Sequence, residues 1–105
     1  MLAIYLRARG YTVVEAPNGN VAMDVLVTSA PDVLVTDLFM PEMDGFELII
    51  AARRHRPGLK IIAMTGSPRS EAYLRTAQTM GATRTIKKPF KGEELVALVG
   101  ELLAD

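Results

Sequence analysis

The positions of apolar and polar residues divide the chain into short segments in which helix and strand patterns alternate. Two segments are apolar runs without alternation, Val33–Asp37 and Lys60–Thr65. Such runs are typical of strands buried on both faces, as in a parallel sheet covered by helices. We also predict a strand at residues 11–16, where alternation indicates one exposed side. A further strand is predicted at residues 83–87, where the charges suit a sheet edge.

Helical spacing of the remaining apolar residues predicts helices between these strands. The predicted helices cover residues 1–9, 20–29, 45–55, 69–80 and 92–103. Asp44 is a candidate N-cap for the helix that begins at residue 45, because its side chain can accept a hydrogen bond from the first turn. The repeated order of helix and strand is that of a three-layer α/β domain with a parallel sheet. We therefore expect a single domain over residues 1–105.

Composition excludes several classes of function. Half of the 105 residues are hydrophobic, which argues against disorder, and twelve basic residues balance twelve acidic ones. That balance removes a global electrostatic case for nucleic acid or an anionic membrane. The chain has no cysteine and a single histidine, so thiol catalysis and cysteine-based zinc sites are excluded. No apolar run approaches the roughly 20 residues of a membrane helix, no signal peptide is visible, and we expect a cytoplasmic protein.

Three polar residues stand where predicted strands end: Asp37, Thr65 and Lys88. In open parallel sheets, chemistry gathers at the carboxyl ends of the strands, so an acid, a hydroxyl and an amine could share one crevice. A carboxylate there can attack phosphorus and form an aspartyl phosphate. That reaction needs charge neutralisation, usually by Mg²⁺ and a cationic side chain. Pro89 supports a role for Lys88 because it fixes the backbone at the strand end.

Each of these residues also has a purely structural interpretation. Asp37 could cap a loop, and its position alone favours neither interpretation. Lys88 could be a solvated lysine, and Thr65 could bond to its own backbone at a strand end. Gly66 leaves room for a ligand, although glycine is common in turns. The basic stretch at residues 53–56 ends a helix, where cations meet the dipole favourably, and we interpret it as a solvated face.

The combination of motifs is more specific than any one of them. Residues 37–45 read Asp-Leu-Phe-Met-Pro-Glu-Met-Asp-Gly, a later strand ends in Thr65-Gly66, and Lys88-Pro89-Phe90 follows. In this order and spacing the chain resembles the receiver domain of bacterial two-component response regulators. The resemblance runs from Met1 to the last helix. It implies a flavodoxin-like fold, which is a three-layer α/β architecture with a parallel sheet.

The resemblance also implies a role for each residue of the predicted site. Asp37 is expected to be the phosphoacceptor, Thr65 the switch hydroxyl and Lys88 the cation that pairs with the phosphoryl group. Asp37 and the backbone carbonyl of Phe39 are expected to bind Mg²⁺, and the Lys88–Pro89 peptide is expected to be cis. The loops around the site are expected to depend on Met40, Pro41, Gly45, Gly66 and Pro89.

The sequence departs from the family pattern at two places. The family usually has an aromatic switch residue three positions before the lysine, where this chain has Thr85. The family also begins with an apolar strand that ends in an acidic pair holding Mg²⁺, whereas this chain begins within what resembles the first helix. We therefore expect a receiver fold that lacks its first, central strand, is incomplete at the N-terminus, and has a weak or absent Mg²⁺ site.

Loss of a central strand needs compensation. About five buried apolar side chains at roughly 1.5–3 kcal/mol each amount to the typical total stability of a domain, about 5–15 kcal/mol. The sheet could close, with residues 11–16 pairing directly beside Val33–Asp37. Alternatively, open edges could pair between chains and form a homo-oligomer, which is the outcome we favour.

Two classes of function follow, and neither makes the chain an enzyme. In the first, a sensor histidine kinase or phosphotransfer protein phosphorylates Asp37, and the helix at residues 69–80 changes a surface that binds a downstream protein. In the second, the chain is a phosphorylation-incompetent interaction or dimerisation module, because one carboxylate and one carbonyl make a poor Mg²⁺ site. A phosphatase is disfavoured because Phe39 stands where a second aspartate is needed, and a flavin protein because no phosphate-binding loop is present.

Overall fold

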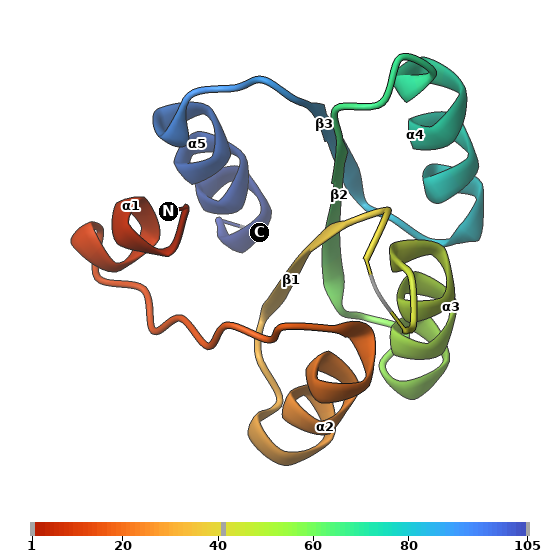
Figure 1. The fold of residues 1–105 in the computed structure, drawn as a ribbon. Coiled ribbons are helices and arrows are strands. Elements are labelled where there is room, and N and C mark those ends of the chain that lie inside the picture. Colours follow the sequence, from red (N-terminus) through yellow and green to blue (C-terminus); the bar gives the residue numbers. More distant parts are fainter. Residues whose placement is uncertain (1, 41, 105) are drawn as a thin grey trace.

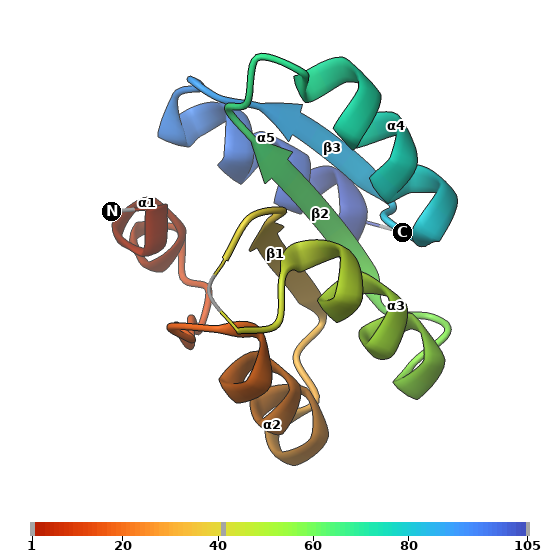
Figure 2. The same cartoon turned by 45° about the vertical axis from the view of Figure 1, so that its right-hand side comes forward.

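A computed structural model describes residues 2–40 and 42–104. Along the chain the elements are α1 (Leu2–Ala8), α2 (Gly19–Ser29), β1 (Val33–Asp37), α3 (Gly45–His55), β2 (Lys60–Thr65), α4 (Ser70–Met80), β3 (Arg84–Lys87) and α5 (Gly92–Leu103). The strands form one parallel sheet in the order β1-β2-β3, with β2 in the middle (Figure 2). Figure 1 shows α1 and α5 on one side of the sheet and α3 and α4 on the other, which gives three layers.

Two apolar cores lie on opposite faces of the sheet, because successive side chains of a strand point to opposite faces. On one face, Ile61 and Ala63 of β2 belong to a buried cluster with residues of α2, α3 and α4. On the other face, Ile62 packs with Leu6 of α1 and with buried residues of α5. β2 is covered on both faces and both edges, and five of its six residues are buried. The prediction of a strand buried on both faces is wrong for Val33–Asp37, because β1 is an edge strand of the described sheet and only Thr36 in it is buried.

The helix α1 is held chiefly by α5, the last element of the chain. Leu6 lies in the core cluster that α5 builds, and the ring of Tyr5 packs so closely on Gly92 that a Cβ there would lie 2.4 Å from the ring. The first and last elements of the described chain are therefore packed together.

The sequence predicted most element positions. β1, β2, α3 and α5 have the predicted bounds, and the helix predicted from residue 1 is described from Leu2. Asp44 caps α3 as expected, since its Oδ1 accepts a hydrogen bond of 2.9 Å from the N–H of Glu47. None of the helices within residues 2–40 and 42–104 has both the length and the apolar character of a membrane span.

The strand predicted at residues 11–16 is wrong. This segment has no regular secondary structure and joins no sheet among the described residues. It passes from α1 on one face of the sheet to α2 (Figure 1), and Val14 is 59% exposed. A cavity of about 690 Å³ lies between it and β1, so its backbone has no neighbouring strand with which to pair. The closed sheet considered above, with this segment directly beside β1, is therefore not formed.

Arg53, near the end of α3, connects two loops to that helix. Its guanidinium donates hydrogen bonds to the carbonyls of Pro57 at 2.7 Å, Leu59 at 2.6 Å and Gly81 at 2.5 Å. Arg56 of the same basic stretch donates to the carbonyl of Pro31. The interpretation of residues 53–56 as a solvated face is therefore wrong for these two arginines, which satisfy backbone carbonyls within the fold.

We predict that Arg53→Ala lowers the free energy of unfolding by about 2–3 kcal/mol, because hydrogen bonds to charged groups contribute roughly 1.5–3 kcal/mol. Arg54→Ala is the matched control, since Arg54 is exposed and makes no hydrogen bond through its side chain within the described residues. It should change stability by less than about 0.5 kcal/mol. Urea unfolding followed by circular dichroism measures both variants, and equal losses would contradict this role of Arg53.

Candidate functional site

The structure brings Asp37 and Lys88 into contact at the carboxyl end of the sheet. Nζ of Lys88 lies 2.5 Å from Oδ1 of Asp37. Asp37 ends β1 and Lys88 follows β3, so the two side chains reach each other across the end of the central strand. The acid and the amine that the sequence placed at two strand ends thus meet.

This ion pair is only partly shielded from water, with side-chain exposures of 40% for Lys88 and 38% for Asp37. Solvent screens pairs of this kind, which stabilise a fold by about 0–1 kcal/mol. The pair therefore matters less for stability than for where it places charge. A carboxylate that solvent can reach has a fixed cation beside it, and that cation can neutralise negative charge on an incoming group.

Thr65 ends β2, the strand between β1 and β3. Thr65 is buried, at 3% exposure, and its carbonyl accepts a hydrogen bond of 3.0 Å from the N–H of Lys88. Its Oγ1 accepts a bond of 3.3 Å from the N–H of Ser67. The structural interpretation of Thr65, a strand-end hydroxyl bonded to nearby backbone, thus holds. A hydroxyl also carries one donor, so Thr65 retains a proton for a second partner.

Two buried hydroxyl residues beside the site were missed by the sequence analysis. Oγ1 of Thr36 donates a bond of 2.8 Å to the carbonyl of Asp37 and lies 3.8 Å from Sδ of Met40. Oγ of Ser70, the first residue of α4, donates to the carbonyl of Ser67. Both residues fix the loops that follow the strands. In the sequence, only the position of Thr36 next to Asp37 and the position of Ser70 at the start of a helix could have indicated these roles.

Two glycines lie at close approaches at the site. A Cβ on Gly45 would lie 2.1 Å from the carbonyl oxygen of Asp37 and 2.6 Å from Cα of Leu38, so only glycine lets α3 begin against the end of β1. A Cβ on Gly66 would lie 3.2 Å from Cβ of Lys88. A Cβ there would thus lie against the side chain of Lys88, and the room for a ligand that we expected at Gly66 stays a prediction.

The structure also places the other predicted loop and switch residues. The Lys88–Pro89 peptide is cis, as expected. Thr85 is half-buried on β3, and Met40 packs against the core on the α3 side of the sheet. Pro41 lies outside the described residues.

Three aromatic rings cluster beside the site. The ring of Phe39 lies 5.0 Å from that of Tyr73 on α4 and 6.0 Å from that of Phe46 on α3, both edge to face. Such pairs contribute roughly 0.5–1.5 kcal/mol beyond the area they bury. Phe39 remains 54% exposed, so the loop after β1 carries a solvent-facing ring that touches both neighbouring helices.

The donor set around Asp37 does not suit Mg²⁺ by itself. That ion prefers octahedral coordination by oxygen, usually with carboxylates and several waters. Within residues 2–40 and 42–104, no group of three histidine, cysteine or acidic side chains could hold a metal ion. Oδ1 of Asp37 is already paired with Lys88. Asp37 and the carbonyl of Phe39, the ligands expected from the sequence, therefore do not make a complete site with the other described residues.

Comparison with known proteins identifies the family. The family model of the response regulator receiver domain matches residues 1–100. The chain belongs to this family. It is 35% identical over 99 residues to the DNA-binding transcriptional regulator NtrC of Klebsiella pneumoniae, covering 94% of this chain and 21% of that protein. It is 30% identical to the response regulator SaeR of Staphylococcus aureus, covering 94% of this chain and 42% of SaeR. The receiver chain thus spans less than half of these relatives.

Solved receiver structures confirm the fold class. Chemotaxis protein CheY4 of Vibrio cholerae is 28% identical, with a TM-score of 0.85 over 96% of this chain and 85% of CheY4. The receiver domain of NtrX from Brucella abortus superimposes with a TM-score of 0.92 over 98% of this chain and 87% of that domain, at 23% identity. The predicted three-layer, flavodoxin-like receiver fold is therefore confirmed.

We predict that Gly45→Ala lowers the free energy of unfolding by about 1–3 kcal/mol, the usual cost of overpacking. Gly58→Ala is the control, because a Cβ there meets nothing within 4 Å and its φ is not positive. The control should stay within about 0.5 kcal/mol of the parent. Chemical denaturation measures both, and a Gly45→Ala protein as stable as the parent would disprove the close approach.

Proposed function

We propose that this receiver domain, taken as one domain over residues 1–105, is the phosphoacceptor of a two-component phosphorelay. A sensor histidine kinase or phosphotransfer protein would supply the phosphoryl group to Asp37. The supporting observation is the contact of 2.5 Å between Asp37 and Lys88 at the end of a receiver sheet. The domain acts by changing a surface for a downstream protein, not by turning over a substrate. A cytoplasmic location is part of the proposal, because it would let the domain meet these partners.

The proposed reaction uses groups already in place. A carboxylate oxygen of Asp37 attacks phosphorus and forms an acyl phosphate, while the bond from phosphorus to the donor nitrogen breaks and the donor keeps its electron pair. The ammonium group of Lys88 neutralises negative charge that gathers on the phosphoryl oxygens. The hydroxyl of Thr65 donates its proton in a hydrogen bond to one of these oxygens. In the product, Lys88 exchanges its carboxylate partner for the phosphoryl group.

The hydroxyl of Thr65 connects this reaction to α4. Its Oγ1 now holds the N–H of Ser67, whose own Oγ accepts a bond of 3.2 Å from the N–H of Arg69. The carbonyl of Ser67 accepts from Ser70, which starts α4. When Thr65 turns to the phosphoryl group, Ser67 loses its acceptor and the first turn of α4 loses support. This route does not need an aromatic switch residue at position 85, where this chain has Thr85.

A second surface feature supports α4 as the responding element. Phe39, two residues after Asp37, touches Tyr73 of α4 and is 54% exposed. Exposed aromatic residues are enriched where proteins bind one another. We therefore place the downstream partner on the surface formed by the loop after β1 and α4.

The incomplete donor set favours an alternative function. Without a complete magnesium site among the residues that the structure describes, the contact between Lys88 and Asp37 could be a permanent ion pair in a phosphorylation-incompetent interaction module. Self-association through an open sheet edge is the form of this alternative that we expected from the sequence. It stays a prediction, and static light scattering at micromolar concentration tests it.

We predict that incubation with acetyl phosphate and Mg²⁺ adds one phosphoryl group to the intact protein, and that Asp37→Asn abolishes this mass gain. Asp44→Asn is the control, because asparagine is as good an N-cap as aspartate and α3 keeps its start. Equal labelling of Asp37→Asn would overturn the assignment of the acceptor. No gain in folded protein would favour the interaction module.

We predict that phosphorylation speeds amide exchange in the first turn of α4, because Ser67 loses its bond to Thr65. Thr65→Val keeps the shape of the side chain but removes the hydroxyl, so labelled Thr65→Val protein should show no further change in α4. Thr76→Val, on the exposed face of α4, is the control and should respond like the parent. Hydrogen exchange with mass spectrometry measures all three proteins, and an unchanged response in Thr65→Val would exclude this route.

A further inference from the structure

The rings of Phe39, Phe46 and Tyr73 gather between the loop after β1 and the helices α3 and α4. The chain has six aromatic side chains, three phenylalanines and three tyrosines, and each of these three rings contacts the other two. The closest pair is Phe39 and Tyr73, with 5.0 Å between ring centroids and an interplanar angle of 75°. This edge-to-face geometry is favourable, because the positive edge of one ring meets the negative face of the other. The three rings form an aromatic cluster that joins the segment after Asp37 to both helices.

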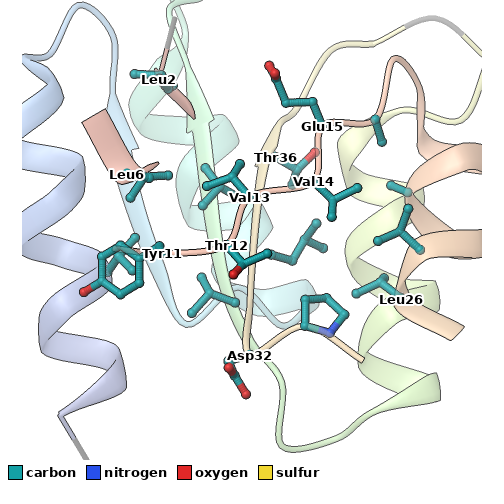
Figure 3. A pocket seen from close by; sticks show the side chains of 18 of the residues that line it. Leu2, Leu6, Tyr11, Thr12, Val13, Val14, Glu15, Leu26, Asp32 and Thr36 are labelled. Carbon is teal, nitrogen blue, oxygen red and sulfur yellow. The ribbon is translucent and has the colours of Figure 1, made fainter. Parts of the chain in front are cut away.

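Phe39 follows a stretch of backbone that hydrogen bonds hold in place. The hydroxyl of Thr36, which lines the cavity beside β1 (Figure 3), donates to the carbonyl of Asp37 at 2.8 Å. Leu38 donates its N–H to β2 at 3.1 Å and accepts a bond of 2.9 Å from the N–H of Gly45. Phe39 makes no backbone hydrogen bond with another described residue. The place of Phe39 therefore depends on its ring contacts more than on the sheet.

Phe46 is a fixed member of the aromatic cluster. It is the second residue of α3, whose start is held by the side-chain cap of Asp44 and by the close approach of Gly45 to the end of β1. Phe46 and Tyr73 also pack, partly buried, against the core between the sheet and these helices. A ring of α4 that packs on Phe39 and Phe46 thus contacts parts of the fold that are anchored independently of α4.

The start of α4 has fewer polar contacts than the starts of α2 and α3. Its N-cap, Arg69, makes no capping hydrogen bond through its side chain, whereas α2 and α3 are both capped in this way. The N–H of Tyr73 donates to the carbonyl of Arg69 at 3.1 Å and closes the first turn. The N–H of Ser70 donates to the carbonyl of Ser67 at 3.0 Å. Tyr73 therefore both closes the first turn and packs that turn on the aromatic cluster.

The first turn of α4 in turn decides what the hydroxyl of Thr65 binds. Oγ1 of Thr65 accepts a bond of 3.3 Å from the N–H of Ser67. The carbonyl of Ser67 accepts from both the N–H and Oγ of Ser70, the first residue of α4. While the turn is packed, Ser67 stays beside Thr65. When the turn opens and Ser67 moves away, Thr65 loses no bond by turning toward a phosphoryl group.

We propose that Tyr73 is a positioning residue of this site and acts through the ring of Phe39. The contact between the two rings keeps the first turn of α4 packed. It thereby holds Ser67 on the hydroxyl of Thr65 and favours the unphosphorylated state. Phosphorylation and opening of the first turn then favour one another, because coupling between two equilibria is reciprocal.

This ring contact differs in place from the aromatic switch residue of the family. That residue would stand at Thr85 on β3, whereas the aromatic cluster belongs to α3, α4 and the loop after β1. The packing of α4 by the rings does not depend on phosphorylation. Its effect on the reaction at Asp37 rests on the proposed function.

The test measures amide exchange of the full chain by NMR at Ser70, whose N–H is bonded just before the first turn. We expect Tyr73→Leu to speed this exchange by roughly twofold to tenfold, the factor that corresponds to one aromatic pair. Tyr73→Phe is the matched control, because it keeps the ring and removes only the hydroxyl, and it should exchange like the parent. Val99→Ala, in the core on the other face of the sheet, lowers global stability but should leave local opening at Ser70 unchanged.

A double-mutant cycle tests whether the two rings act on each other. Phe39→Leu should also speed exchange at Ser70, and the double variant with Tyr73→Leu should be accelerated by less than the product of the two single factors. A full product would overturn the proposal, because the rings would then act independently. So would equal exchange in Tyr73→Leu and Tyr73→Phe, or an acceleration in Val99→Ala as large as that in Tyr73→Leu.

Labelling with acetyl phosphate and Mg²⁺ tests the effect on Asp37. The mass gain should be faster in Tyr73→Leu than in Tyr73→Phe, because more molecules have the hydroxyl of Thr65 released from Ser67. Equal labelling rates in these two variants and the parent would overturn the role of Tyr73 and leave the proposed function standing. If no protein gains mass, the proposed function is overturned together with this role, and the exchange results alone decide whether the rings hold α4.

Discussion

The pairing of β2 with a strand on each side is the constraint on which the rest of the structure depends. Hydrogen bonds outside the strands extend this pairing at both ends of β3. Thr83 bonds to the backbone of Ile61 before the strand, and the N–H of Lys88 bonds to the carbonyl of Thr65 after it. A slip of one residue would turn every side chain of β3 to the opposite face. The register of β2 and β3 therefore decides that Lys88 reaches Asp37.

Around this sheet, the site combines groups of different burial. Asp37 and Lys88 are half-exposed, and their ion pair can exchange partners at little cost. Thr65 is buried but holds only a backbone N–H through its hydroxyl. The stability of the fold thus resides in the apolar clusters, while the polar contacts at the carboxyl ends of the strands contribute little to it. That division suits the proposed function, in which one surface changes while the fold stays intact.

The sequence was most informative where a local pattern determines structure. The apolar run before Asp37, the cap at Asp44 and the strand ends at Thr65 and Lys88 each depend on a few neighbouring residues. The strand predicted at residues 11–16 failed because alternation reports which side is exposed, and not whether a neighbouring strand exists. Arg53 was misinterpreted for a related reason.

The three carbonyl groups that bond to Arg53 come from two loops, and a pattern along the sequence does not show that these loops lie together. Thr36 and Ser70 carry no periodic signal, so their hydrogen bonds could only be found in three dimensions. Gly66 was expected to leave room for a ligand, and the sequence could not show that the side chain of Lys88 lies beside it.

The packing of α1 on α5 has a consequence for the order of folding. Contact between the first and last elements closes a loop of nearly the whole chain, and the entropy lost in that closure must be offset by a small apolar interface. The three strands and the helices between them close much shorter loops, so we expect them to form first and α1 to dock last. By the same balance we expect α1 to detach at the lowest free energy in the native protein, as a unit, while the sheet stays intact. Because Leu2 and Leu6 line the cavity beside β1, each such opening would widen the entrance to that cavity.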